Sequence, residues 1–278
     1  MTKKNKQHNA VTYILLIGGV LLILLPLYVT VVTSLKSNEQ SAQSFFSLPI
    51  PLYLESFKEI LSSERYYRAL FNTIYITAIV LAGNVIIMPA MSYAVARKMP
   101  ESKWYRHIYA FLLLGIFIPF QVKMMPLVKM LSGLEMMNPT GLAILCISSS
   151  TCESVFLFVG YMGAIPIDME EAAQIDGAGT FLTYRSIVFP LLKPMLATVL
   201  IKQGLWIWND FMLPLITLNK TWENWTLTLF QYNFQTEYSI NYSLTFATFT
   251  LSMLPLVVFY CFMQKAIIGG LTAGAVKS

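Results

Sequence analysis

Six long stretches of the sequence carry few or no charged side chains and approach the length needed to cross a lipid bilayer. An α-helix rises about 1.5 Å per residue and therefore needs roughly 20 residues to span a hydrocarbon core about 30 Å thick. The stretches cover Val11–Leu35, Ala69–Ala96, Ile108–Met125, Met136–Met162, Met195–Ile216 and Leu244–Met263. The pattern predicts an all-α membrane protein with six transmembrane helices, of which the third and fifth have the least distinct ends.

The first stretch is expected to remain in the mature protein. At 25 residues it is longer than the apolar region of a signal peptide, and it lacks a small-residue cleavage site. We therefore expect an N-terminal tail over residues 1–10, a transmembrane domain over residues 11–270 and a C-terminal tail over residues 271–278.

Composition supports a membrane protein and excludes most other classes. Hydrophobic residues make up 56% of the chain and charged residues 12%, whereas soluble domains carry about 25% charged residues. The net charge of +5 does not indicate nucleic-acid binding, because the basic residues lie at the edges of the apolar stretches. Their excess in loops such as Arg97–Arg106 predicts that both termini are cytoplasmic. The three cysteines lie in apolar stretches and are expected to be buried and unpaired.

The segment 164–194, between the fourth and fifth stretches, is too polar and too long for a simple connection. Asp168 and Glu171 have the spacing of a capping box, which predicts a short helix that starts near Pro166. Gly177 is expected to end that helix, and a second helix should run from Thr180 until Pro190 ends it. The segment is thus predicted to form a helical hairpin on the cytoplasmic face. A plain surface connector is the alternative.

Two triplets and a later proline in this hairpin match a known pattern. The sequence reads Glu171-Ala172-Ala173, then Asp176-Gly177-Ala178, then Ile187-Val188-Phe189-Pro190. This arrangement resembles the EAA loop of permease subunits in binding-protein-dependent ATP-binding-cassette (ABC) importers. Gln121 and the segments Trp208–Phe211 and Gly270–Lys277 resemble the carbohydrate-importing branch, in particular the shorter permease component of maltose-type importers.

The resemblance implies the type I ABC importer permease fold and a role in sugar uptake into a bacterial cell across the cytoplasmic membrane. It implies three kinds of protein partner besides lipid: a second permease chain, two ATPase subunits and an extracytoplasmic solute-binding protein. The residues that would couple the chain to the ATPase are Glu171, Ala172, Ala173, Asp176, Gly177, Ala178 and Pro190. The chain has no GxxxxGK[ST] phosphate loop, so ATP and magnesium are expected on the partner. We expect no catalytic, metal or cofactor site here.

Polar side chains inside the stretches are candidates for the substrate pathway. Glu153 and Lys202 lie at similar expected depths, so they either pair across adjacent helices or face an aqueous pore separately. Ser149 belongs to a hydroxyl-rich run that either lines the sugar pathway or packs helices together. Asn209 and Asp210, beside two tryptophans, suit sugar binding, although tryptophan also anchors helices at the membrane surface.

Other functions fit the sequence less well. A permease for a non-sugar solute remains open, because the EAA loop is widely shared among importers. An ion-driven carrier often has internal repeats, and none relates the two halves of this chain. A membrane enzyme would need a catalytic constellation that two isolated histidines do not supply. The tail Leu271–Ser278 either contacts the ATPase or only caps the last helix.

Overall fold

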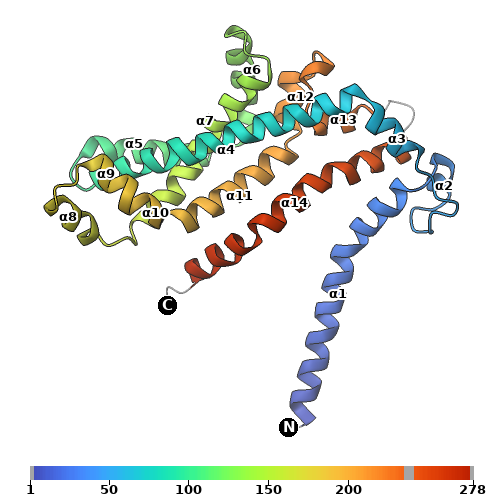
Figure 1. The fold of residues 1–278 in the computed structure, drawn as a ribbon, viewed down its shortest axis with the longest axis horizontal. Helices are drawn as coiled ribbons and strands as arrows, with labels where there is room; N and C mark the ends of the chain where they lie inside the picture. The colour runs from blue at the N-terminus through green and yellow to red at the C-terminus, as the bar shows by residue number, and fades with distance from the viewer. Residues whose placement is uncertain (1–2, 235–240, 276–278) are drawn as a thin grey trace. The chain divides into compact units, whose positions relative to one another are not determined.

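The computed structural model describes residues 3–234 and 241–275, and every regular element in these ranges is helical (Figure 1). The elements are α1 (Lys3–Ser34), α2 (Asn38–Gln43), α3 (Glu55–Ser62), α4 (Glu64–Lys98), α5 (Lys103–Ile116), α6 (Phe120–Gly133), α7 (Pro139–Met162), α8 (Asp168–Ile175), α9 (Thr180–Thr183), the π-helical turn η1 (Tyr184–Val188), α10 (Phe189–Leu191), α11 (Lys193–Asn209), α12 (Met212–Leu218), the 3₁₀ turn η2 (Trp222–Asn224), α13 (Leu227–Tyr232) and α14 (Tyr242–Ala275). The chain divides into two compact units, unit 1 over residues 1–67 and 230–256 and unit 2 over residues 68–229 and 257–278.

Four of the six predicted spans are confirmed as continuous helices. The apolar part of α1 covers Thr12–Ser34, and α4, α7 and the Tyr242–Phe262 part of α14 are likewise long and apolar enough to cross a membrane. α14 continues to Ala275, so the expected C-terminal tail is helical over its first residues. Residues 1–2 and 276–278, which belong to the two predicted tails, lie outside the described residues.

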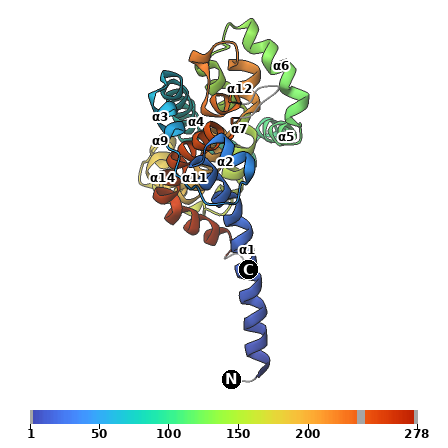
Figure 2. The ribbon, with the colours of Figure 1, turned by 90° about the vertical axis from the view of Figure 1, so that its right-hand side faces the viewer.

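The third predicted span is a bent pair of helices and not one straight helix. α5 and α6 meet at an angle of 106° across the break at 117–119, and they point in different directions in Figure 2. Pro119 explains the break, because its ring disfavours helical geometry at Ile118 and it has no amide hydrogen to continue the ladder. The prediction of a single helix over Ile108–Met125 was therefore wrong.

The fifth predicted span is also interrupted. α11 ends at Asn209, and Asp210 has an extended backbone with φ −67° and ψ 127°. The Asp210 carboxylate accepts a hydrogen bond from the Leu213 amide at 3.4 Å, and its carbonyl accepts one from the Thr228 hydroxyl at 2.8 Å. Asp210 thus ends one helix and starts the next, so the single helix predicted over Met195–Ile216 was wrong. If α5 with α6 and the helix over Thr180–Leu191 with α11 are each taken as one span, the described chain has up to six spans.

α7 is the central helix of unit 2 and contacts α5, α11 and α12. Buried residues around its N-terminal half come from α4, α6, α11, α12 and α13, and Cys146 lies among them. A second buried cluster surrounds its C-terminal half: Met88, Tyr93, Val95, Val155, Phe158, Val159, Met162, Val188, Leu192 and Val199. This second cluster joins α4 and α7 to η1 and α11. It is the base on which the hairpin after α7 is built.

A buried polar network joins α4 to α7. The Asn84 amide donates to Ser150 Oγ at 3.1 Å, and Ser154 Oγ donates to Asn84 Oδ1 at 2.8 Å. Hydroxyl groups that bond across a helix pair hold it together in lipid. For Ser150, the packing alternative considered from the sequence is therefore the correct one, whereas Ser149 is only half-buried.

Unit 1 places the segment after α1 against the start of α14. Ser243 Oγ donates to the Lys36 carbonyl at 2.6 Å, and the Tyr242 amide donates to Asn38 Oδ1 at 2.9 Å. The Lys36 ammonium is fully buried and donates to the Ser44 carbonyl at 2.8 Å. Burial lowers the pKa of Lys36, because desolvation disfavours its charged form.

The three cysteines are unpaired, as expected, but they are not all buried. Cys146 is buried, Cys152 is half-buried and Cys261 is exposed. A residue of a membrane helix can be apolar because it faces lipid and not because it faces the protein core. Apolar surroundings in the sequence therefore did not determine burial at Cys261.

We predict opposite effects for one substitution at two glycines of α7. A Cβ atom at Gly141 would lie 2.0 Å from the Met136 carbonyl oxygen, whereas nothing lies within 4 Å of a Cβ atom at Gly160. Gly141→Ala should lower the thermal unfolding midpoint of the detergent-purified protein. Gly160→Ala should leave it unchanged or raise it, because glycine inside a helix costs roughly 0.5–1 kcal/mol relative to alanine. Equal midpoints for the two variants would contradict the close approach at Gly141.

Candidate functional site

The hairpin predicted after the fourth span is present, and its first helix is α8. Asp168, Glu170 and Glu171 lie in the first turn of α8, where carboxylates interact favourably with the helix dipole. The predicted capping box is wrong. The residue before the helix is Ile167, which already has helical backbone angles, and no side chain caps the helix. Asp168 is thus inside the first turn and not at the position from which a cap is made.

Gly177 ends α8, as predicted. Its φ is +89°, in the left-handed region that side chains with a Cβ atom disfavour. The Ala178 amide donates to the Ala173 carbonyl at 2.9 Å, and the Gly177 amide donates to the Gln174 carbonyl at 3.0 Å. These two bonds form a Schellman motif, which satisfies the last carbonyls of the helix. The turn therefore depends on the residue type at one position.

The second helix of the hairpin starts at Thr180 as predicted and ends at Leu191, one residue after Pro190. It passes through α9 and the π-helical turn η1 into α10, where Pro190 lies in the last turn. The chain bends at Leu192, and the helix over Thr180–Leu191 makes an angle of 70° with α11. Pro190 is tolerated because it lies in the first turn of α10, two residues after the end of the π-helical turn, where a proline needs no amide donor. After this bend the chain continues as α11, which packs against α7.

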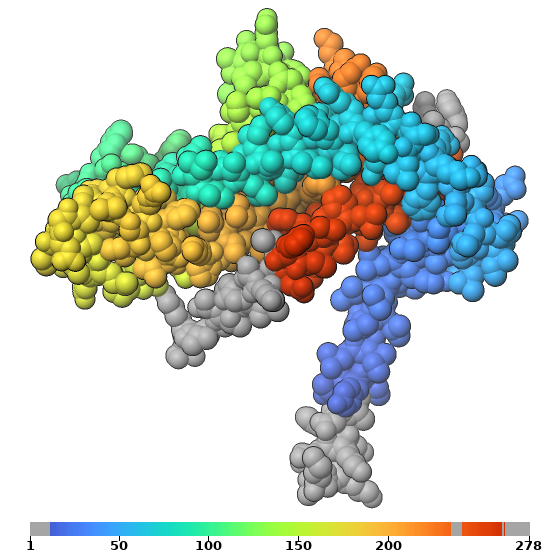
Figure 3. Space-filling view, viewed as in Figure 1, coloured from blue at the N-terminus to red at the C-terminus, as the bar shows by residue number. Residues whose placement is uncertain are grey.

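Most of the predicted coupling residues lie on the outer surface of the hairpin. Glu171, Ala172, Asp176, Gly177 and Pro190 are exposed, and Ala173 and Ala178 are half-buried. Two apolar side chains beside them are also exposed, Ile175 to 87% and Phe181 to 73%. Figure 3 shows this hairpin, in yellow, forming one end of unit 2. The surface therefore combines carboxylates, a thin alanine-rich turn and unpartnered apolar groups, a combination that suits a protein partner.

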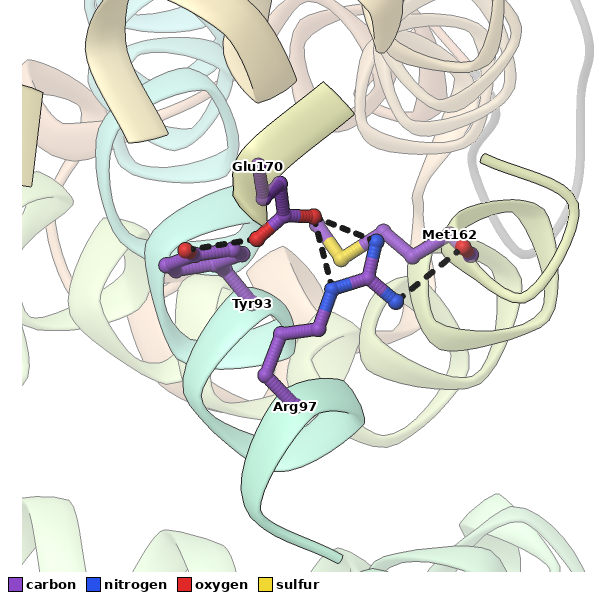
Figure 4. Close-up of polar contacts among 4 residues, drawn as sticks. All are labelled: Tyr93, Arg97, Met162 and Glu170. Carbon is purple, nitrogen blue, oxygen red and sulfur yellow. Dashed lines mark hydrogen bonds and ion pairs between the residues drawn. The ribbon is translucent and has the colours of Figure 1, made fainter. Parts of the chain in front are cut away.

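A buried carboxylate attaches α8 to the rest of unit 2 (Figure 4). The Glu170 side chain is 4% exposed, and its Oε1 forms an ion pair with Arg97 Nη2 at 2.6 Å. The same oxygen accepts a hydrogen bond from Arg97 Nε at 2.8 Å, and Oε2 accepts one from the Tyr93 hydroxyl at 2.8 Å. Sequence reasoning gave Glu170 no role beyond the helix dipole, because its partners lie more than 70 residues earlier in the chain. We call Tyr93, Arg97 and Glu170 the carboxylate clamp.

Glu153 and Lys202 form an ion pair between α7 and α11, which confirms the pairing considered from their depths in the sequence. Both side chains are partly exposed on unit 2, to 38% and 52% respectively. Asn209 donates to the Leu205 carbonyl of its own helix at 2.8 Å. Among the candidate pathway side chains, Glu153 thus pairs with a different helix and Asn209 bonds within its own helix. Asp210 contacts the start of α12 through its carboxylate and Thr228 of α13 through its carbonyl.

Comparison with known proteins identifies the family. Residues 86–272 match the model of the binding-protein-dependent transport system inner membrane component. The chain belongs to this family. The match covers α7, the hairpin and α11 in full, and it establishes the chain as a component of an inner-membrane transport system, which is a transport family and not an enzyme family.

Similar curated proteins are permeases named for sugar transport. The chain is 42% identical to the multiple sugar-binding transport system permease protein MsmG of Streptococcus mutans, and the alignment covers 100% of both chains. It is 32% identical to the probable starch degradation products transport system permease protein AmyC of Thermoanaerobacterium thermosulfurigenes, with 95% of this chain and 97% of AmyC covered.

The fold matches a solved structure of an importer. A chain of a bacterial ABC transporter involved in the import of the acidic polysaccharide alginate has a TM-score of 0.83 at 20% sequence identity, with 95% of this chain and 98% of that chain covered. This likeness confirms the expected type I ABC importer permease fold.

The Glu153–Lys202 pair should be testable by charge exchange. Glu153→Lys and Lys202→Glu should each lower the amount of folded protein in membranes, because an unpaired charge near the centre of a membrane helix costs roughly 2.5–3.5 kcal/mol on insertion scales. The double exchange should restore part of the loss. The same exchange at the exposed pair Glu55 and Lys58 should have little effect. If the double exchange yields no more folded protein than either single variant, the Glu153–Lys202 ion pair does not stabilise the folded protein.

Proposed function

We propose that this chain is one of two permease subunits of an ABC importer that takes up oligosaccharides, and that ATP hydrolysis on partner ATPase subunits drives the uptake. Family membership supports the importer, and 42% identity to a multiple-sugar permease over the full length supports the sugar substrate. The observation that carries the coupling role is the exposed surface of the α8–α9 hairpin, where Glu171, Asp176 and Gly177 surround an exposed Ile175.

In the proposed assembly the hairpin lies on the cytoplasmic side and docks on an ATPase subunit. The basic residues that flank the spans support this orientation and a cytoplasmic location of both termini. ATP and magnesium would be bound by the ATPase, because this chain has no phosphate loop. Closure of the two ATPases would then move the hairpin as a body.

A solute-binding protein and a second permease chain complete the proposed importer. A solved alginate importer with a TM-score of 0.68 to this chain was crystallised in complex with an alginate pentasaccharide-bound periplasmic protein. The partly exposed Glu153–Lys202 pair supports an aqueous or protein-covered surface at this point of α7 and α11, because charged side chains do not face lipid. We assign Glu153 to the substrate pathway on this basis, and Ser149, Asn209 and Asp210 because they are polar side chains within the predicted spans.

The substrate class is tested with the importer assembled from this chain, a second permease chain, the ATPase subunits and the binding protein. ATP hydrolysis of the reconstituted complex is measured with the binding protein and a panel of melibiose, raffinose, stachyose, maltooligosaccharides and arabinooligosaccharides, with amino acids and dipeptides as controls. We expect stimulation by at least one oligosaccharide and by none of the controls. Stimulation only by a non-sugar solute would overturn the substrate class, and uptake by this chain without ATPase partners would overturn the importer.

The turn at Gly177 gives a sharper prediction for coupling. Gly177→Val should reduce ATP-driven uptake by at least about fivefold, because a β-branched residue at positive φ costs more than about 1 kcal/mol. Gly177→Asn should retain most uptake, since asparagine tolerates this backbone region.

Gly179 provides the matched control for the turn. Its φ is −73° and nothing lies within 4 Å of an added Cβ atom, so Gly179→Ala should transport at the wild-type rate. Equal losses for the valine and asparagine variants at position 177 would show that side-chain bulk matters there and not the backbone conformation.

A further inference from the structure

We propose that Glu170 is a positioning residue that transmits movement of the hairpin to α4. The inference deepens the proposed function, because it assumes that α8 docks on an ATPase. It adds a second route for the movement. The first route is the chain itself, which leads from α9 through α10 into α11. The second is the carboxylate clamp, which joins α8 directly to a helix that precedes it by some 70 residues.

Within α8, burial is confined to a single side chain. Glu170 has the only buried side chain among the eight residues of α8, all of which the structure describes. The other seven are exposed or half-buried. A helix of this length is marginal without tertiary contacts. Besides the packing of α8 against α9 and η1, the contacts of this one buried carboxylate set its position relative to α4.

The geometry of the clamp makes those contacts directional. Both carboxylate oxygens are used, one by Arg97 through two nitrogens at 2.6 and 2.8 Å and the other by the Tyr93 hydroxyl at 2.8 Å. Arg97 Nη1 also lies 3.5 Å from the Met162 carbonyl at the end of α7. Charge-assisted bonds at a buried site are short and orientation-dependent. A shift of α8 relative to α4 would therefore lengthen several of them at once.

Tyr93 extends the connection to the second helix of the hairpin. Its ring lies 5.3 Å from the ring of Tyr184, centroid to centroid, while its hydroxyl bonds to Glu170. Val188, one turn further along the hairpin, is fully buried in the same cluster as Tyr93. One side chain of α4 thus contacts both helices of the hairpin. The hairpin and the C-terminal end of α4 form a single packed body.

α4 carries the connection to the opposite end of unit 2. Asn72 lies 25 residues before Arg97, which corresponds to roughly 37 Å along a helix. Its amide donates to the carbonyls of Glu223 and Trp225 at 2.8 and 2.9 Å. A movement of α4 would therefore also reach the segment around η2. The clamp thus connects the hairpin to α4, which is hydrogen-bonded to α8 near its C-terminal end and to the segment around η2 near its N-terminal end.

The test uses the complete importer in liposomes and measures sugar uptake per ATP hydrolysed. Glu170→Ala should lower this ratio by at least about fivefold, as expected for a coupling free energy of about 1 kcal/mol or more. Basal ATP hydrolysis and co-purification with the ATPase should stay near wild type. Tyr93→Phe, which removes only the hydroxyl, should lower the ratio by a smaller factor. The double exchange Glu170→Arg with Arg97→Glu should recover part of the ratio lost in either single exchange.

Glu101→Gln is the matched control, since Glu101 lies just after α4 and forms only an exposed ion pair with Lys98, with side chains 69% and 58% exposed. It should leave the ratio unchanged.

An unchanged ratio in Glu170→Ala would overturn the inference. So would a parallel loss of assembly, ATP hydrolysis and uptake without recovery in the double exchange, because that pattern indicates a purely structural residue. Failure of the proposed function looks different, since the wild-type complex itself would then take up none of the sugars.

Discussion

The position of the hairpin depends on a carboxylate that cannot be buried without partners. Removing a carboxylate from water is costly unless charged and hydrogen-bonding groups replace the solvent. Glu170 is surrounded by Arg97 and Tyr93, which satisfy both of its oxygens. The same contacts leave the neighbouring Glu171 and Asp176 exposed. Burial of one acidic residue thus leaves the others on the outer surface, where the proposed ATPase would dock.

The two broken spans follow from a related constraint on the backbone. Inside lipid every amide and carbonyl needs a partner, so a helix can break only where other groups supply one. At the second break, Asp210 accepts from the Leu213 amide and Thr228 donates to the Asp210 carbonyl. Asp210 is therefore explained first as the residue that makes this break possible, and its proposed place in the substrate pathway comes in addition to that role.

Local features of the candidate site could be predicted from the sequence. The helix end at Gly177 depends on the backbone freedom of a single residue, and the exposure of Glu171 and Asp176 follows from a short polar helix at the membrane surface. The capping box failed because Asp168 and Glu171 have the right spacing but Asp168 is already the first residue of the helix, after Ile167. Spacing alone does not fix which residue precedes the first turn. Pro190 predicted the end of the second hairpin helix to within one residue, because that helix ends at Leu191.

The sequence by itself determined that the chain is a helical membrane protein, where its four continuous spans lie and that a hairpin follows the fourth. These properties depend on apolar length and on turn residues, which act within a few positions of the chain. Only the tertiary structure decided that Glu170 and not Glu171 is buried, that Ser150 packs against Asn84 and that Cys261 faces outward. Each of those outcomes depends on which side of a helix packs against a segment distant in the chain. Such long-range packing cannot be predicted from composition or from local patterns in the sequence.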